Sequence, residues 1–161
     1  MQQTDGDDEY TNSALLCRER HANNCVQLLS AELSGTDVDI AAVTETWFNI
    51  TTAYTAIVGY SLIRQDHIRR RSGGVGIYCC SSLISEVVET PQHVARLQSG
   101  HETLCVKITK CSQLNLQMVV YHPPKLIYNS HDFVTRLTND VNYLTSTYPH
   151  AVLILTGDFT D

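Results

Sequence analysis

Glu45 and Asp158 are acidic residues that each follow a short apolar segment. Glu45 comes after residues 38–43 (VDIAAV), and Asp158 comes after residues 151–156 (AVLILT). Short apolar runs of this kind are typical of buried strands, and open α/β sheets bind ligands at the carboxyl ends of their strands. Two carboxylates meeting there would suit Mg²⁺, which takes oxygen ligands and keeps several waters. On placement alone, the alternative is that each residue forms an ordinary turn after its strand.

A second candidate site is the basic, glycine-containing segment 64–78 (RQDHIRRRSGGVGIY). Arginine side chains offer a fork of donors that matches phosphate, and glycines let the backbone approach a ligand closely. The alternative is a solvated basic turn that leads into a strand needing small residues. A phosphate-binding P-loop is excluded, because the sequence contains no GxxxxGK[ST] motif.

Strands are predicted to carry most of these residues. Apolar segments rich in β-branched and aromatic residues, separated by turn-formers or charges, are typical of a sheet-rich domain. The predicted strands are residues 38–43, 56–63, 74–80, 83–88, 103–108, 114–121 and 151–156.

Two helices are predicted beside the strands. The first spans residues 16–33, with an apolar face at helical spacing and Gly35 as its stop signal. The second begins at Ser130 as N-cap and ends before Pro149, with an apolar face formed by Phe133, Leu137, Val141 and Leu144. The order of elements predicts a mixed α/β fold with sheets at the centre and helices outside.

Composition indicates one domain with an acidic tail. The chain has 161 residues, of which 43% are hydrophobic, enough for one core. Its formal charge of −6 disfavours a protein that coats nucleic acid through its overall field. Residues 1–11 are acidic and almost free of apolar side chains, so we expect a disordered tail there.

The cysteines and the hydropathy pattern limit the cellular setting. The six cysteines form no CxxC pair and no zinc spacing, which favours reduced thiols over ligands or disulfides. No apolar segment approaches the ~18 residues of a membrane span, and the N-terminus lacks the features of a signal peptide. We therefore expect a nuclear or cytoplasmic protein that is not secreted.

Five segments together carry a resemblance to a known family. They are VDIAAVTETWF, GYSLIRQDHIRRRSGGVGIY, HETLCVKI, VVYHPP and LILTGDF, in this order. The sequence resembles the endonuclease/exonuclease/phosphatase superfamily and, more narrowly, the apurinic-type endonuclease domain of non-LTR (LINE-like) retrotransposons. The resemblance implies a deoxyribonuclease I-like four-layer α/β sandwich in which residues 12–161 form the N-terminal part. The fold would be incomplete at its C-terminus and would lack the first strand.

The resemblance also implies a catalytic set. Glu45 of TETW would hold a divalent metal, Mg²⁺ or alternatively Mn²⁺, and Asn12 would support that ligand. Asp158 of GDF would orient or deprotonate the attacking water. Tyr121 of YHPP would border the scissile phosphate, although it could instead be an ordinary aromatic residue at a strand end. Thr160 stands where relatives have an asparagine that hydrogen-bonds the phosphate.

Substrate contacts are implied in the basic segment and after Tyr121. Arg64 and Asp66 would lie near the substrate backbone, with Arg70 and Arg71 in the same segment. His122 stands where many relatives have arginine. The implied substrate is the phosphate backbone of target DNA, and a parent element would join a reverse transcriptase to this domain.

Two functions follow from these similarities and departures. The first is a Mg²⁺-dependent DNA endonuclease that nicks a target and is impaired by truncation. The second is a catalytically inactive remnant that at most binds nucleic acid or protein. The second is suggested by Thr160 and by the absence of a closing Ser-Asp-His motif after Asp158. A phosphatase of the same superfamily is a third option, but the TETW and glycine-containing segments resemble the retroelement branch more closely.

Overall fold

The computed structural model describes residues 12–16, 22–48, 55–66, 73–91, 102–110, 112–122 and 129–158. For residues 12–16, 22–25 and 130 it describes only the backbone. The predicted acidic tail, Arg70, Arg71 and Thr160 lie outside these ranges.

The first sheet contains four of the described strands in the order β1-β2-β4-β3. These are β1 (Asn12–Leu16), β2 (Ile40–Thr44), β4 (Val75–Cys80) and β3 (Tyr60–Gln65). β1 is parallel to β2, whereas β4 is antiparallel to both of its neighbours.

The second sheet contains another four described strands in the order β5-β6-β7-β8. These are β5 (Ile84–Val87), β6 (Glu102–Lys110), β7 (Gln113–Tyr121) and β8 (Val152–Asp158). β6 is antiparallel to both β5 and β7, and β8 joins β7 in parallel.

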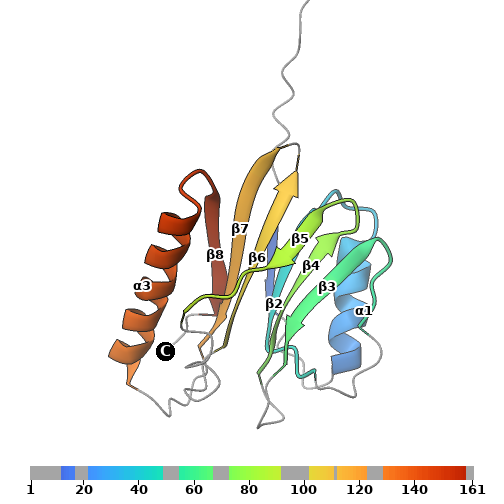
Figure 1. Cartoon of the computed structure of the whole chain (residues 1–161). Helices are drawn as coiled ribbons and strands as arrows, with labels where there is room; N and C mark the ends of the chain where they lie inside the picture. Colours follow the sequence, from blue (N-terminus) through green and yellow to red (C-terminus); the bar gives the residue numbers. More distant parts are fainter. Residues whose placement is uncertain are drawn as a thin grey trace, which may run out of the picture.

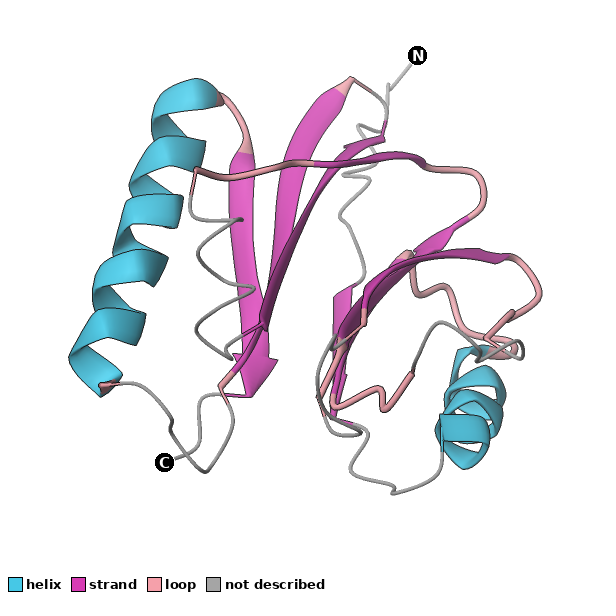
Figure 2. Cartoon of the chain, turned by 60° about the horizontal axis from the view of Figure 1, so that its bottom comes forward, coloured by secondary structure: helices cyan, strands magenta, loops and turns pink. Residues whose placement is uncertain are grey.

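Each sheet is covered on its outer face by a helix, so the described elements form four layers (Figures 1 and 2). Helix α1 (Ala22–Leu33) packs on the first sheet through Val26, Leu29 and Leu33. Helix α3 (Ser130–Thr147) packs on the second sheet through Phe133 and Leu144. The helices bury the apolar faces that their spacing predicted.

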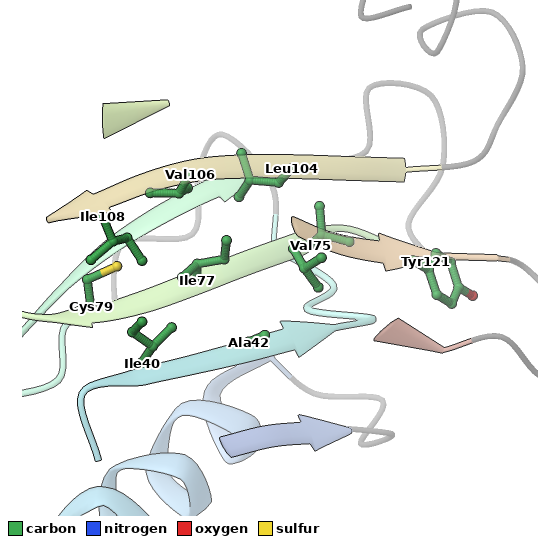
Figure 3. Packing of buried hydrophobic residues seen from close by; sticks show 10 residues of the cluster. Ile40, Ala42, Val75, Ile77, Cys79, Leu104, Val106, Ile108 and Tyr121 are labelled. Carbon is green, nitrogen blue, oxygen red and sulfur yellow. The ribbon is translucent and has the colours of Figure 1, made fainter. Parts of the chain in front are cut away.

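The two sheets pack face to face over an apolar core (Figure 3). Alternate residues of each strand point inward, as the two-residue period of a strand requires. The inner residues of this core are Ile40, Ala42, Val75, Ile77, Cys79, Leu104, Val106, Ile108, Val119 and Tyr121. Tyr121 lies at one end of the cluster, and its hydroxyl points away from the aliphatic side chains.

The fold class predicted from the sequence is confirmed, while several boundaries differ. Residues 12–16 pair with β2 as strand β1, so the helix predicted from residue 16 begins at Ala22. A strand therefore lies at the N-terminal edge, where none was expected. The strand predicted at 56–63 runs from Tyr60 to Gln65, with a turn before it. The second helix is capped by Asn129, whose side chain accepts a hydrogen bond from the His131 N–H, and not by Ser130.

The described cysteines are free thiols, as predicted for Cys79, Cys80 and Cys105. Cys79 is buried between the sheets and Cys80 is partly exposed, because neighbouring strand residues point to opposite faces. Burial raises the pKa of the Cys79 thiol to about 11, so this thiol stays protonated and unreactive. Among the described helices, none is long and apolar enough to cross a membrane.

Adjacent leucines on α1 test its packing on the first sheet. Leu29 is 4% exposed and Leu28 is 54% exposed. Leu29→Ala is expected to lower the free energy of unfolding by about 2–5 kcal/mol because it leaves a cavity in the core. Leu28→Ala, the matched control, should change it by no more than about 0.5 kcal/mol. Urea unfolding measures both values, and equal losses would contradict the packing of this helix.

Candidate functional site

The strand registers bring the predicted acidic residues to one end of the sandwich. In the first sheet Thr44, which precedes Glu45, pairs with Val75. In the second sheet Tyr121 pairs with Glu102 on one side and with Asp158 on the other. The carboxyl ends of β2, β7 and β8 therefore meet at the same end of the molecule.

Tyr121 links the two sheets at this end. Its hydroxyl donates a hydrogen bond to Glu45 Oε1 at 2.6 Å, and the residue is 5% exposed. Burial raises the pKa of Tyr121, and the hydrogen bond to Glu45 and the charges of Glu45, Glu102 and Asp158 raise it further. The phenol is therefore a neutral donor at physiological pH, surrounded by three carboxyl groups.

The backbone around Glu45 adopts a conformation that residues other than glycine rarely adopt. Glu45 has φ 52° and Trp47 has φ 54°, both in the left-handed region. Such outliers persist only where surrounding contacts hold them. The Thr46 N–H donates to the Gly74 carbonyl at 3.2 Å, and the Trp47 N–H donates to the Gly73 carbonyl at 2.9 Å. The glycine turn thus holds the segment that carries Glu45.

Gly74 is required in this turn by both space and conformation. It has φ +90°, and a Cβ added there would lie 2.3 Å from Thr46 Oγ1. The glycines of the basic segment therefore let two backbone segments approach each other. In the structure these glycines support the TETW segment that carries Glu45. Contact with a phosphate was one of the two roles predicted for them from the sequence.

Glu102 is a site residue that the sequence prediction missed. It is 5% exposed and accepts a hydrogen bond from the Gly74 N–H. Burial raises the pKa of Glu102 to about 7, the Gly74 hydrogen bond lowers it, and the charges of Asp66 and Glu45 raise it. The available signal was a carboxylate near the start of the apolar segment HETLCVKI.

Asp158 ends β8 and is 8% exposed. The glycine before it allows β8 to lie tightly on β7, because a Cβ at Gly157 would be 2.0 Å from the Val120 carbonyl oxygen. The Asp158 carbonyl also accepts a hydrogen bond from the His122 N–H at 3.2 Å. These contacts fix the position of Asp158 beside Tyr121.

Arg64 and Asp66 form an ion pair at the rim, with 3.4 Å between Arg64 Nε and Asp66 Oδ1. Arg64 follows Tyr60 and Leu62 at two-residue spacing, and both of these pack on the helix-covered face of the first sheet. Its guanidinium carbon lies 5.5 Å from the centre of the Phe48 ring. Arg64 is therefore held beside Phe48, and Asp66 is the member of the pair whose charge reaches Glu102.

His122 and Asn12 are not brought to the site as the sequence suggested. His122 is 5% exposed beneath α3, with its ring centre 4.4 Å from that of Phe133. It faces away from Tyr121 because consecutive strand residues alternate. Asn12 pairs with Ile40, whereas Leu16 pairs with Thr44 next to Glu45. Asn12 thus lies four residues, roughly 13 Å along a strand, from the end that carries Glu45.

The oxygen donors at this end fit a hard divalent cation. The Glu45 carboxylate accepts the Tyr121 hydroxyl hydrogen, and the carboxyl groups of Glu102 and Asp158 lie near enough for their charges to raise the Tyr121 pKa. Across the described residues, no three His, Cys, Asp or Glu side chains are arranged to enclose a metal ion. Mg²⁺ needs no such enclosure, since it is usually bound by one or two carboxylates with waters and substrate phosphates.

Solved structures of several proteins have a similar fold. A humanized D. rerio TDP2 is similar with a TM-score of 0.66 and 15% identity, over 92% of this chain and 61% of that chain. The endonuclease domain of TRAS1, a telomere-specific non-LTR retrotransposon, has a TM-score of 0.57 and 15% identity, over 93% and 58%. D. rerio TDP2 with a single-strand DNA product has a TM-score of 0.57 and 17% identity, over 84% and 54%.

These likenesses define the class of fold. The chain has the deoxyribonuclease I-like fold that these solved structures share. It spans between 54% and 61% of the lengths of the three solved chains. By sequence, no known protein family and no curated protein matches it.

The raised pKa of Glu102 predicts a pH-dependent stability. The folded carboxyl binds its proton more tightly than the unfolded one, with a pKa of about 7 against 4.5. The stabilisation from protonated Glu102 is therefore complete below pH 4.5 and is lost as pH rises through 7. The total loss in the free energy of unfolding is up to about 3 kcal/mol. Glu102→Gln should remove this loss.

Urea unfolding at pH 5 and pH 8 in the presence of EDTA measures the effect. Wild type is expected to lose more stability between the two pH values than Glu102→Gln. Glu86→Gln on exposed β5 is the control and should behave as wild type, since its carboxylate is at the surface. Identical pH dependence in wild type and Glu102→Gln would contradict the assignment.

Proposed function

We propose that this chain is the N-terminal part of a divalent-metal-dependent DNA endonuclease of the non-LTR retrotransposon type. The observation that carries the proposal is the 2.6 Å hydrogen bond from Tyr121 to Glu45, with Asp158 beside Tyr121 by register. Glu45, Asp158 and the phenol thus lie at the carboxyl ends of buried strands, and Glu102 opens β6 as the register partner of Tyr121. The TRAS1 endonuclease domain and the DNA-bound TDP2 support a nucleic-acid substrate.

Glu45 would hold the metal, with Mg²⁺ as the first choice and Mn²⁺ as the alternative. Bound there, the ion would neutralise charge on the phosphate and on the leaving 3′ oxygen. The left-handed backbone at Glu45 and its hydrogen bond from Tyr121 orient the carboxylate before substrate arrives. Preorganised groups of this kind need no rearrangement at the moment of reaction.

Asp158 would accept the proton of the attacking water. The water oxygen would bond to phosphorus as the bond from phosphorus to the 3′ oxygen breaks, and the departing 3′ oxygen would take a proton from solvent water to become a 3′ hydroxyl. Tyr121 would keep donating its single hydroxyl hydrogen to Glu45 and so hold that carboxylate beside the scissile phosphate, since its raised pKa keeps it protonated. In a retroelement the 3′ hydroxyl would prime a reverse transcriptase joined to this domain.

A second candidate is an inactive remnant that binds nucleic acid or protein. It is favoured by the placement of Asn12, four residues from the end of β1 next to Glu45, and of His122, whose ring packs on Phe133 beneath α3. The chain also spans only 58% of the TRAS1 endonuclease domain. The two candidates share one fold and differ in whether the acidic groups turn over a substrate.

Nicking of supercoiled plasmid by the purified chain with Mg²⁺ separates the two candidates. Wild type is expected to nick, while Glu45→Gln and Asp158→Asn should each lower the rate by about 10²–10⁴-fold. Glu32→Gln on the exposed side of α1 removes a carboxylate far from the site and should leave the rate unchanged. If wild type and all variants are equally silent, the inactive remnant is the better description.

Tyr121→Phe tests the phenol separately from the carboxylates. It removes one donor without changing ring packing, so the rate of nicking should fall by about 10²-fold. The midpoint of urea unfolding should change little, because the aromatic ring remains in the core. An unchanged rate in a folded Tyr121→Phe variant would limit Tyr121 to a structural role.

A further inference from the structure

We propose that Glu102 is a positioning residue for Glu45, acting through the Gly73-Gly74 turn. The inference rests on the proposed function in one respect, because Glu45 is taken there as the metal ligand. Glu102 lies on the second sheet and Glu45 follows a strand of the first sheet. Glu102 on the second sheet would therefore orient the Glu45 carboxylate across the interface between the sheets.

The first step is the contact between Glu102 and the turn. Glu102 Oε2 accepts the Gly74 N–H. Its other oxygen lies so close to Gly73 that an added Cβ would be 2.9 Å from Oε1. One carboxyl group thus touches both glycines. Without this acceptor, the buried Gly74 N–H would lose its hydrogen bond, which is costly in a region closed to water.

The second step connects the turn to Glu45. The carbonyls of Gly73 and Gly74 accept the N–H groups of Trp47 and Thr46, at 2.9 and 3.2 Å. These two residues follow Glu45 directly, and Glu45 and Trp47 have positive φ. A conformation of this kind is unfavourable for a residue other than glycine and needs external support. The turn provides that support, and Glu102 holds the turn.

The third step is the position of Glu102 next to Tyr121. The two residues are register partners in the antiparallel pair of β6 and β7. Tyr121 binds the Glu45 carboxylate directly, while Glu102 binds the turn behind it. Neighbouring positions on one sheet therefore fix both the side chain and the backbone of Glu45. Groups that orient a metal ligand in this way typically change metal affinity or activity by 10–100-fold when they are mutated.

The alternative is that Glu102 only caps the start of β4. Trp47 distinguishes the two roles, because it is the single tryptophan of the sequence and its backbone N–H donates a hydrogen bond to the turn. Its emission and its quenching by acrylamide report the conformation of the segment next to Glu45. Glu102→Ala is expected to shift the emission and increase quenching in the folded protein. Glu102→Gln keeps an oxygen acceptor for the Gly74 N–H and should restore both values.

Binding of Mn²⁺, followed by calorimetry, gives the second readout. Glu102→Ala should weaken binding by about 10–100-fold relative to wild type, and Glu102→Gln should recover most of the loss. The control is Thr103→Ala, which alters the next residue of β6, buried on the opposite face. It should change the unfolding midpoint without changing Trp47 emission.

Unchanged Trp47 emission and quenching in folded Glu102→Ala would overturn the proposal, as would equal changes in Thr103→Ala. If Glu102→Ala does not fold, Glu102→Asp applies the same test, since its shorter side chain withdraws the acceptor from Gly74. Failure of the proposed function is separate. In that case wild type binds no Mn²⁺ and nicks no DNA, while Trp47 still responds to Glu102.

Discussion

Two polar contacts between the sheets, at one end of their apolar core, determine the geometry of the site. Tyr121 donates to Glu45, and Glu102 accepts from Gly74. Buried polar groups are costly unless they are hydrogen-bonded, so both contacts must form together with the core. A slip of β7 by one residue would turn Tyr121 toward α3 and break the first contact. Correct register in the second sheet is therefore a condition for the site in the first.

The glycines of the site act through close approach of the backbone. Gly74 makes room for the Thr46 hydroxyl, and Gly157 lets β8 lie against the Val120 carbonyl. Both positions reject a Cβ, so larger residues there would move a carboxylate of the site. The strained backbone at Glu45 depends on the first of these contacts. Free energy from the packed sheets thus maintains a local conformation that the segment would not adopt alone.

The alternation of strand side chains decides which predicted residues reach the site. Tyr121 and His122 are adjacent, yet the first faces Glu45 and the second packs on Phe133 beneath α3. Arg64 lies beside Phe48 on the face covered by α1, while Asp66 exerts its charge on Glu102. Family motifs align residues along the chain, but the pleat of each strand separates neighbours onto opposite faces.

The sequence by itself determined the fold class, most strands, both helices and the shared location of Glu45, Tyr121 and Asp158. Local hydrophobic patterns predict the mixed α/β class and the strand ends that carry Glu45 and Asp158, because those ends are marked by the change from apolar to polar residues. The deoxyribonuclease I-like fold and the place of Tyr121 were implied by the family resemblance. It did not determine β1 or the cap at Asn129, where pairing and hydrogen bonding outweighed local preference. It also missed Glu102, whose partner Gly74 is 28 residues away. Only tertiary structure decided this contact, since no local pattern specifies which residues meet across two packed sheets.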